Sequence, residues 1–222
     1  MLDPAHGGTD PGARGPSGPA EKDVVLQFAR ATRVELVRQG YRVVLTRDDD
    51  SNPSYDDRAA IANSYHDAIL ITFHVSSTGT VGTARAYFYQ FWSRFPHQSQ
   101  APSADTGQAA STSAQPPASP LAISSPTLVP WNEAQRPYAD ASHRLADQLQ
   151  LQFTQQFQGS PSASRGVAIR GLRSVAAPAV AVEISSVAAP NGNALTSMAA
   201  PLAGSIARAI QSFRPANTAG AK

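Results

Sequence analysis

Apolar side chains recur along this chain at two different spacings. Between Glu21 and Gln39 they return every three to four residues, which predicts a helix, and Gly40 follows as its C-terminal stop. Residues 68–73, with the sequence AILITF, form an unbroken apolar run that is typical of a strand buried on both faces. Helical segments that alternate with such strands predict an α/β fold.

The same patterns predict further elements on either side. Ser54 and Asp57 resemble a capping box at the start of a helix. Residues 1–2 look like the end of a first strand; further strands are expected at 41–46, 83–91 and 178–183, and helices at 54–65, 138–157 and 196–213. Together these elements predict a single α/β domain over residues 1–214, with a mixed central β-sheet flanked by helices on both faces.

Three segments lack these patterns. Residues 1–20 are rich in glycine and proline and are expected to form a loop. Residues 98–130 consist mostly of Ser, Pro, Ala, Gln and Thr, with almost no charge, so we expect a low-complexity insert that interrupts the domain. Residues 215–222 are expected to be a disordered tail.

Composition narrows the possible chemistry. The chain has no cysteine, which excludes disulfides and thiolate metal sites, so any zinc ion must be held by histidine and carboxylate side chains. The net charge of +2 is too small to indicate nucleic-acid binding, and no stripe of basic and aromatic residues supports it. No apolar run approaches the roughly 18 residues that a membrane span requires.

The first residues are not those of a secretory leader. Asp3 and His6 interrupt any apolar stretch there. Either the protein is cytoplasmic or a leader is missing from this sequence. Because Met1 and Leu2 look like the end of a strand that has lost its start, the second alternative is favoured.

Four reactive side chains are expected at one edge of the predicted sheet. His6 follows the first strand, whereas His74 and Glu183 end two apolar strands. In open α/β sheets, sites form outside the carboxyl ends of the strands. Glu21 begins the first helix, where the helix dipole keeps a carboxylate ionised, as a metal ligand must be.

Two histidines and two carboxylates form a complete set for metal-assisted hydrolysis. Three protein ligands leave the fourth position of tetrahedral zinc to water, and the remaining carboxylate can take a proton from that water. Each residue also has a plainer interpretation: His6 as a loop residue, His74 as a core histidine, and Glu21 as a charge at a helix start. Glu183 has no such simple alternative, because a charge after an apolar strand is rarely buried without a purpose.

The motifs around these residues resemble those of a known enzyme family. DPAHGGTDPGARG, followed by EKDVVLQFA, is similar to the N-terminal signature of the zinc-dependent N-acetylmuramoyl-L-alanine amidases of type 3, the cell-separation amidases. The resemblance continues through LTRDDD, RAAIAN, ITFH and RGVAIRGLRSVAAPAVAVE. It implies that His6, Glu21 and His74 bind one zinc ion and that Glu183 is the catalytic general base. The implied reaction is hydrolysis of the amide between N-acetylmuramic acid and L-alanine in bacterial peptidoglycan.

Three positions depart from the family pattern. Ala5 replaces a glycine before the first histidine, which would cost stability if that position required a positive φ. Val75-Ser76 replaces alanine-asparagine after the second histidine, and 184–187 replaces a segment that usually contains glycine, phenylalanine and asparagine. None of these positions is a proposed ligand, so the departures bear on substrate contacts and turnover.

The resemblance also implies a location and partners. Peptidoglycan lies outside the cytoplasmic membrane, so the protein is expected in the periplasm or secreted, as a monomer. Some amidases of this family carry a segment, at about the place of the insert, that covers the zinc until an activator protein removes it. Here Trp131, Asn132 and Glu133 could reach the site, although a plain disordered linker is the favoured interpretation of the insert.

Two other functions remain open on the sequence. A zinc peptidase that cuts stem peptides would use the same chemistry in a different groove. A non-catalytic peptidoglycan-binding module would keep the fold but is expected to lose a ligand or Glu183.

Other polar residues near these motifs are assigned structural roles. Arg58 is expected to be an ion-pair partner and Asn63 to hold a loop near the site. His66, His97 and His143 are expected to take no part in the chemistry.

Overall fold

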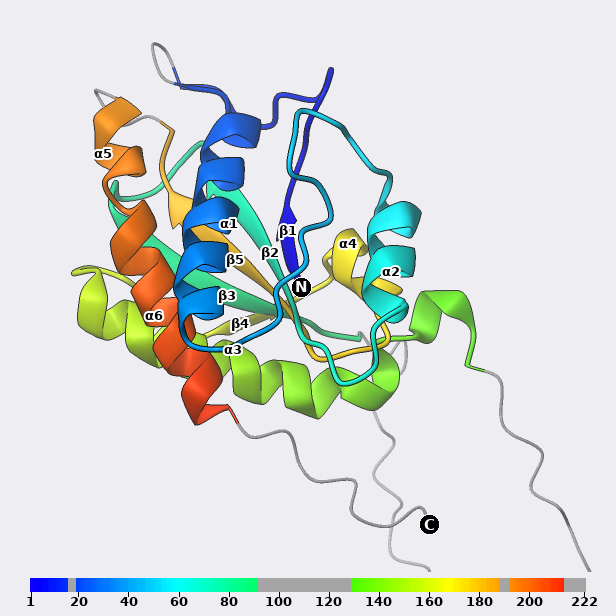
Figure 1. Cartoon of the computed structure of the whole chain (residues 1–222). Coiled ribbons are helices and arrows are strands. Elements are labelled where there is room, and N and C mark those ends of the chain that lie inside the picture. The colour runs from blue at the N-terminus through cyan, green and yellow to red at the C-terminus, as the bar shows by residue number, and fades with distance from the viewer. Residues whose placement is uncertain (16–18, 92–128, 188–191, 214–222) are drawn as a thin grey trace, which may run out of the picture.

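The computed structural model describes residues 1–15, 19–91, 129–187 and 192–213. A central sheet lies between two groups of helices (Figure 1). The predicted insert therefore falls outside the described residues except for 129–130, and the predicted tail at 215–222 falls outside them entirely. In the described part of the chain, no helix has the length and apolar character that a membrane span needs.

The sheet is mixed, as predicted. Its strands are β1 (Leu2–Pro4), β2 (Leu70–Ser76), β3 (Thr83–Tyr89), β4 (Arg165–Val167) and β5 (Ala179–Ser185). They lie in the order β1-β2-β5-β3-β4. The pairs β1–β2, β2–β5 and β3–β4 are parallel, whereas β3 and β5 are antiparallel. The central strands β2 and β5 are therefore parallel neighbours whose carboxyl ends lie at the same edge.

Helices cover the two faces of the sheet unequally. They are α1 (Glu21–Arg38), α2 (Tyr55–Asn63), α3 (Ala139–Gln156), α4 (Arg170–Arg173), α5 (Gly192–Thr196) and α6 (Ala199–Ser212), with 3₁₀ turns at Trp131–Glu133 and Arg136–Tyr138. Side chains of α1, α3, α5 and α6 pack with Phe73 and Val182 in the larger core. On the other face, α2 and α4 pack with Leu70 and Ala181 in a smaller core. The short helices α2 and α4 leave the carboxyl end of this second face open.

The alternation of side chains along β2 and β5 explains what occupies the open area. Phe73 and Val182 are fully buried on the larger core, and the next residues, His74 and Glu183, point to the opposite face. Both side chains are only partly buried. The open end of the sheet therefore presents a histidine and a carboxylate side by side.

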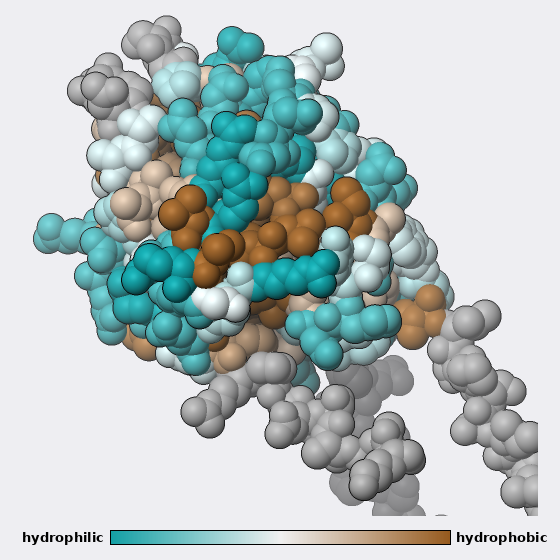
Figure 2. Space-filling model, viewed as in Figure 1, coloured by the Kyte–Doolittle hydropathy of each residue, from teal (hydrophilic) through white to brown (hydrophobic). Residues whose placement is uncertain are grey.

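The segment predicted as a strand at 41–46 forms only one isolated bridge, between Leu45 and Leu2. β1 has only three residues. The N–H of Leu2 donates to the carbonyl of Val44 at 2.8 Å, and the carbonyl of Leu2 accepts from the N–H of Thr46 at 3.0 Å. Because β1 is so short, residues 41–46 cannot form a continuous run of strand hydrogen bonds with it. Apolar side chains gather on the side of the molecule that faces the viewer in Figure 2. Met1, Val43 and other residues line a hollow at the amino end of the sheet.

Several other boundaries differ from prediction. β2 continues to Ser76 and β5 to Ser185, because the two strands stay in register over seven residue pairs. His74 and Glu183 therefore lie inside their strands and not at the ends. The helix predicted at 196–213 is α6, at Ala199–Ser212, whereas the short helix α5 before it, β4 and α4 were not predicted.

Candidate metal centre

Three of the four predicted residues converge at the open edge of the sheet. One ligand atom each from His6, Glu21 and His74 lies within 4.8 Å of the others. Glu21 Oε1 is 3.2 Å from His6 Nε2 and 3.2 Å from His74 Nδ1. These residues come from a loop, a helix start and a strand that lie far apart in the sequence, so the fold itself assembles the cluster.

Glu21 is buried and yet held as a carboxylate. It is the first residue of α1, and its side chain accepts backbone N–H groups from Ala13 at 2.7 Å and Val75 at 2.9 Å. Burial opposes its ionisation, but the hydrogen bonds from the two histidines and the two backbone groups outweigh it and hold the Glu21 pKa well below its usual range. The cluster therefore contains a permanent negative charge of the kind that a divalent cation requires.

Asp10 orients His6. Its Oδ2 lies 2.8 Å from His6 Nδ1, which leaves Nε2 directed at Glu21. The hydrogen bond with Glu21 raises the pKa of His6, with Asp10 adding to the effect and partial burial opposing it. A carboxylate on the far nitrogen of a metal-ligating histidine fixes the tautomer and ring orientation. Asp10 was not singled out from the sequence, although it follows His6 by four residues in the glycine-rich motif.

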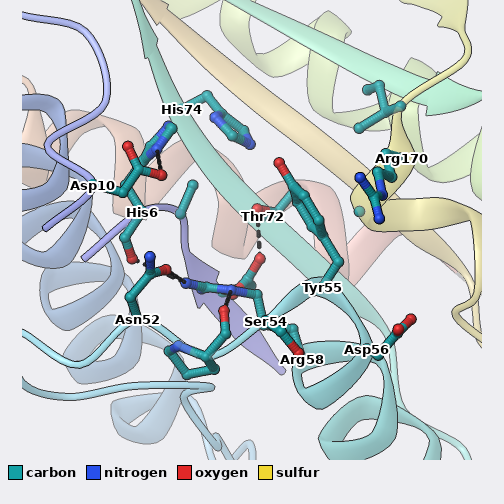
Figure 3. A pocket seen from close by; sticks show the side chains of 15 residues that line it. His6, Asp10, Asn52, Ser54, Tyr55, Asp56, Arg58, Thr72, His74 and Arg170 are labelled. Atoms are coloured by element: carbon teal, nitrogen blue, oxygen red, sulfur yellow. Dashed lines mark hydrogen bonds and ion pairs between the residues drawn. The ribbon is translucent and has the colours of Figure 1, made fainter. Parts of the chain in front are cut away.

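Two buried arginines hold the backbone around His6. Arg47 donates to the carbonyls of Pro4 and Ala5, each at 2.8 Å. Arg58 donates to the carbonyls of Pro4 and His6, each at 2.9 Å (Figure 3). Together they bind three consecutive carbonyls, and His6 itself has φ of 62°, which a non-glycine residue adopts only when its surroundings impose it.

The predicted ion-pair role of Arg58 is confirmed. Its Nη1 lies 2.5 Å from Asp3 Oδ1, and the two side chains are 6% and 9% exposed. Asp3 also accepts the hydroxyls of Thr46 and Thr72. The result is a buried, fully hydrogen-bonded network directly beneath His6.

The backbone of Gly12 lies directly against the side chains of Glu21 and His6. A Cβ on Gly12 would meet Glu21 Oε2 at 2.5 Å and His6 Cδ2 at 2.8 Å, and its φ is +66°. Only glycine fits there. Ala5, by contrast, is not among the described residues with positive φ, so its replacement of glycine causes no backbone strain of that kind.

Glu183 lies beside the cluster and not within it. It is paired in register with His74 on the neighbouring strand, and such strands are about 4.8 Å apart. Tyr87 donates its hydroxyl to Glu183 Oε1 at 3.1 Å, and burial and the charge of Glu183 raise the pKa of Tyr87. Tyr87, which the sequence did not identify, therefore holds one carboxylate oxygen of Glu183 in place.

The donor set fits zinc. With Zn–N and Zn–O bonds of about 2.0–2.2 Å, ligands of a tetrahedral ion lie about 3.3–3.6 Å apart. Glu21 Oε1 is 3.2 Å from each histidine nitrogen, close to that spacing. Two neutral histidine nitrogens and one ionised carboxylate are a set that zinc commonly takes, and they leave its fourth position to water or substrate.

Two cavities adjoin the cluster, and His74 lines both. The larger, of about 410 Å³, runs from His6 and His74 to Tyr55 and Arg170 (Figure 3). The smaller, of about 270 Å³, is lined by His74, Tyr87 and Glu183 among others. An extended substrate can therefore occupy space on both sides of the candidate metal ligands.

The departures from the family pattern near these cavities contact one another. Ser76 and Ser185 face each other across β2 and β5, with their hydroxyl oxygens 3.0 Å apart. Ser76 Oγ also donates to the carbonyl of Thr78 at 2.6 Å. These two serines stabilise the strand ends just beyond His74 and Glu183.

The remaining predicted residues lie outside the cluster. Asn63 bridges the carbonyl of Ser174 and the N–H of Ala176, so it does hold a loop, but that loop precedes β5 and lies at the amino end of the strand, away from the cluster. Trp131 donates to Asp56 at 3.2 Å and Glu133 pairs with Arg136, so neither contacts the three candidate ligands.

The other histidines also lie away from the cluster. His143 stacks on Phe88 with ring centroids 4.1 Å apart. His66 lines the apolar hollow at the opposite end of the sheet. His97 falls outside the described residues.

Known proteins share both the sequence pattern and the fold. The sequence profile of the N-acetylmuramoyl-L-alanine amidases matches residues 1–212. The N-acetylmuramoyl-L-alanine amidase AmiC of Neisseria meningitidis serogroup B is 40% identical over 77 residues, which cover 35% of this chain and 18% of that protein. The sporulation-specific N-acetylmuramoyl-L-alanine amidase of Bacillus subtilis is 39% identical over 91 residues, 40% of this chain and 35% of that protein.

These alignments span only about a third or less of each relative's length. A solved structure, that of the N-acetylmuramoyl-L-alanine amidase AmiC2 of Nostoc punctiforme, superposes with a TM-score of 0.66 over 96% of this chain and 94% of that chain, at 22% identity. The structural likeness establishes the common fold, a single domain with a mixed sheet and flanking helices.

Proposed function

The chain belongs to the N-acetylmuramoyl-L-alanine amidase family, and from this premise we propose that it hydrolyses the amide bond between N-acetylmuramic acid and L-alanine in bacterial peptidoglycan. The observation that carries the proposal is the convergence of His6, Glu21 and His74 beside Glu183. Peptidoglycan lies outside the cytoplasmic membrane, so we place the activity in the periplasm or in the secreted fraction.

We assign His6 Nε2, Glu21 Oε1 and His74 Nδ1 as the three ligands of one zinc ion. Bound zinc supplies a Lewis acid for the scissile carbonyl and lowers the pKa of water at its open position. The protein's own contribution is to keep the ligand set rigid. Asp10 fixes the His6 ring, and backbone N–H groups fix the Glu21 carboxylate.

We assign proton transfer to Glu183. Its Oε1 accepts a hydrogen bond from the Tyr87 hydroxyl, so we assign the proton transfer to Oε2. Oε2 takes a proton from the attacking water as the new C–O bond forms. It then delivers that proton to the nitrogen of L-alanine as the C–N bond breaks, giving a free lactyl carboxyl group and a free amine.

The experiment is digestion of purified peptidoglycan followed by mass analysis of the released material. The proposal predicts intact stem peptides that begin with L-alanine and glycan that carries free lactyl carboxyl groups. Glu183→Gln should give no release, because a neutral amide cannot accept the proton, while its zinc content stays that of the wild type. Products cut between amino acids would identify a peptidase instead, and turnover retained by Glu183→Gln would overturn the assigned role.

A further inference from the structure

The larger cavity is lined, away from the candidate metal ligands, by an arginine that the proposed reaction does not use. His6 and His74 line one side of it, and Arg170 lies across from them beyond Tyr55 (Figure 3). Arg170 opens the four-residue helix α4 and is exposed. It therefore lies on the path that a substrate extending from the metal ligands into this cavity would follow.

Arg170 is the cavity-lining arginine whose donors are uncommitted. The other, Arg58, is buried, and its guanidinium pairs with Asp3 and donates to backbone carbonyls. Within residues 1–15, 19–91, 129–187 and 192–213, Arg170 makes no hydrogen bond and no ion pair. Asp56 lines the same end, but its Oδ1 accepts the Trp131 indole N–H at 3.2 Å, and it forms no ion pair with Arg170 in the described chain.

Tyr55 positions this free guanidinium. The Arg170 guanidinium carbon lies 5.3 Å from the centroid of the Tyr55 ring. Gly171 lets the ring pack closely against α4, since a Cβ there would lie 3.3 Å from Tyr55 Cδ1. A guanidinium that rests on an aromatic face keeps its N–H donors at the edge free for a planar anion such as a carboxylate.

We propose that Arg170 binds a free carboxylate of the peptidoglycan stem peptide, so that the peptide lies in the larger cavity and runs toward Tyr55. This inference rests on the proposed function. The N-acetylated glycan carries no charge along its backbone, whereas the stem peptide carries carboxylates beyond its first alanine. Among the described residues that line this cavity, Arg170 is the one arginine without a hydrogen-bond or ion-pair partner. Its charge therefore favours the peptide side of the substrate, and its fork of N–H donors favours a carboxylate over an amide.

The test uses two soluble N-acetylmuramoyl peptides that differ only in whether the carboxylates after L-alanine are free or amidated. Arg170→Gln removes the charge and should lower kcat/KM for the acidic substrate about tenfold, the effect of one lost charge-assisted hydrogen bond. The same variant should change kcat/KM for the amidated substrate less than about twofold. Arg170→Lys keeps the charge and should retain a preference for the acidic substrate.

Arg173→Gln is the matched control. Arg173 lies on the same helix but donates to the carbonyl of Asn132 at 2.8 Å and does not line the larger cavity. It should leave both rates unchanged. If Arg170→Gln alters the two substrates equally, or alters neither, the carboxylate assignment is wrong while the amidase function stands. If the wild-type protein cleaves neither these substrates nor peptidoglycan, the proposed function itself fails, and the inference fails with it.

Discussion

Replacing Arg58 should unfold the protein far more readily than replacing an arginine on the surface. Arg58→Met keeps much of the side-chain volume but leaves the Asp3 carboxylate buried without its cation. Breaking a buried ion pair from one side costs about 3–5 kcal/mol. For a domain of this size, each kcal/mol lowers the Tm by about 2–4 °C, so a loss of about 6–20 °C is expected.

Arg30→Ala provides the control. Arg30 pairs with Asp48, but both side chains are 47% exposed, and such pairs contribute at most about 1 kcal/mol. Thermal unfolding followed by circular dichroism, with chelator present so that bound metal does not contribute, compares the two variants directly. A second comparison uses the double variant Asp3→Asn with Arg58→Met, which removes both charges.

The double variant should recover part of the loss, since no uncompensated charge stays buried. Two results would refute this reasoning. The first is that Arg58→Met is no more destabilising than Arg30→Ala. The second is that the double variant loses as much stability as Arg58→Met and Asp3→Asn, each measured alone, lose together. Either result would mean that the network beneath His6 is not held by charge pairing.

Three further predictions concern the metal centre. Asp10→Ala should weaken zinc binding by about 10–100-fold in a competition titration with a chromogenic chelator, because His6 loses the partner that fixes its ring; an unchanged affinity would argue against that role. Tyr87→Phe should lower kcat by about tenfold while zinc affinity stays constant, because the hydroxyl contacts Glu183 and not the ligands; a parallel fall in zinc affinity would contradict this assignment. In the metal-free protein, the pKa of His6 is raised above 6.5 and that of Glu21 is lowered below 4.5, so their pairing stabilises the fold most between these values. The contribution of Glu21 should be lost as the pH falls below 4.5, and that of His6 as the pH rises through its raised pKa. Thermal unfolding measured from below pH 4.5 to above pH 6.5 should show both slopes, Glu21→Gln should flatten them, and a flat wild-type profile would count against the pairing.

Much of the fold follows from patterns that act locally. The periodic apolar positions of α1, the capping box at Ser54 and the unbroken apolar run of β2 each reflect forces within a short segment or burial in the core. The mixed sheet with helices on both faces follows from these elements. What could not be predicted is the pairing that depends on partners elsewhere, such as the single bridge at Leu45 and the extension of β2 past His74.

The candidate site likewise contains residues that the sequence identifies and residues that only the structure reveals. His6, Glu21, His74 and Glu183 stand out because charged or imidazole side chains are unusual beside apolar strands and at a buried helix start. Asp10 and Tyr87 do not stand out, because an aspartate in a glycine-rich loop and a tyrosine in a strand are common in any protein. Their roles depend on the distance to His6 and Glu183, which only the folded chain defines.

The most direct test of the central claim is a zinc titration of the metal-depleted protein, with peptidoglycan amide hydrolysis and bound zinc measured in the same samples. Activity should be absent at the start and should rise in proportion to bound zinc until one ion is bound per chain. His74→Ala should neither bind zinc tightly nor gain activity. Hydrolysis by the metal-depleted protein, or full activity in His74→Ala, would contradict the account.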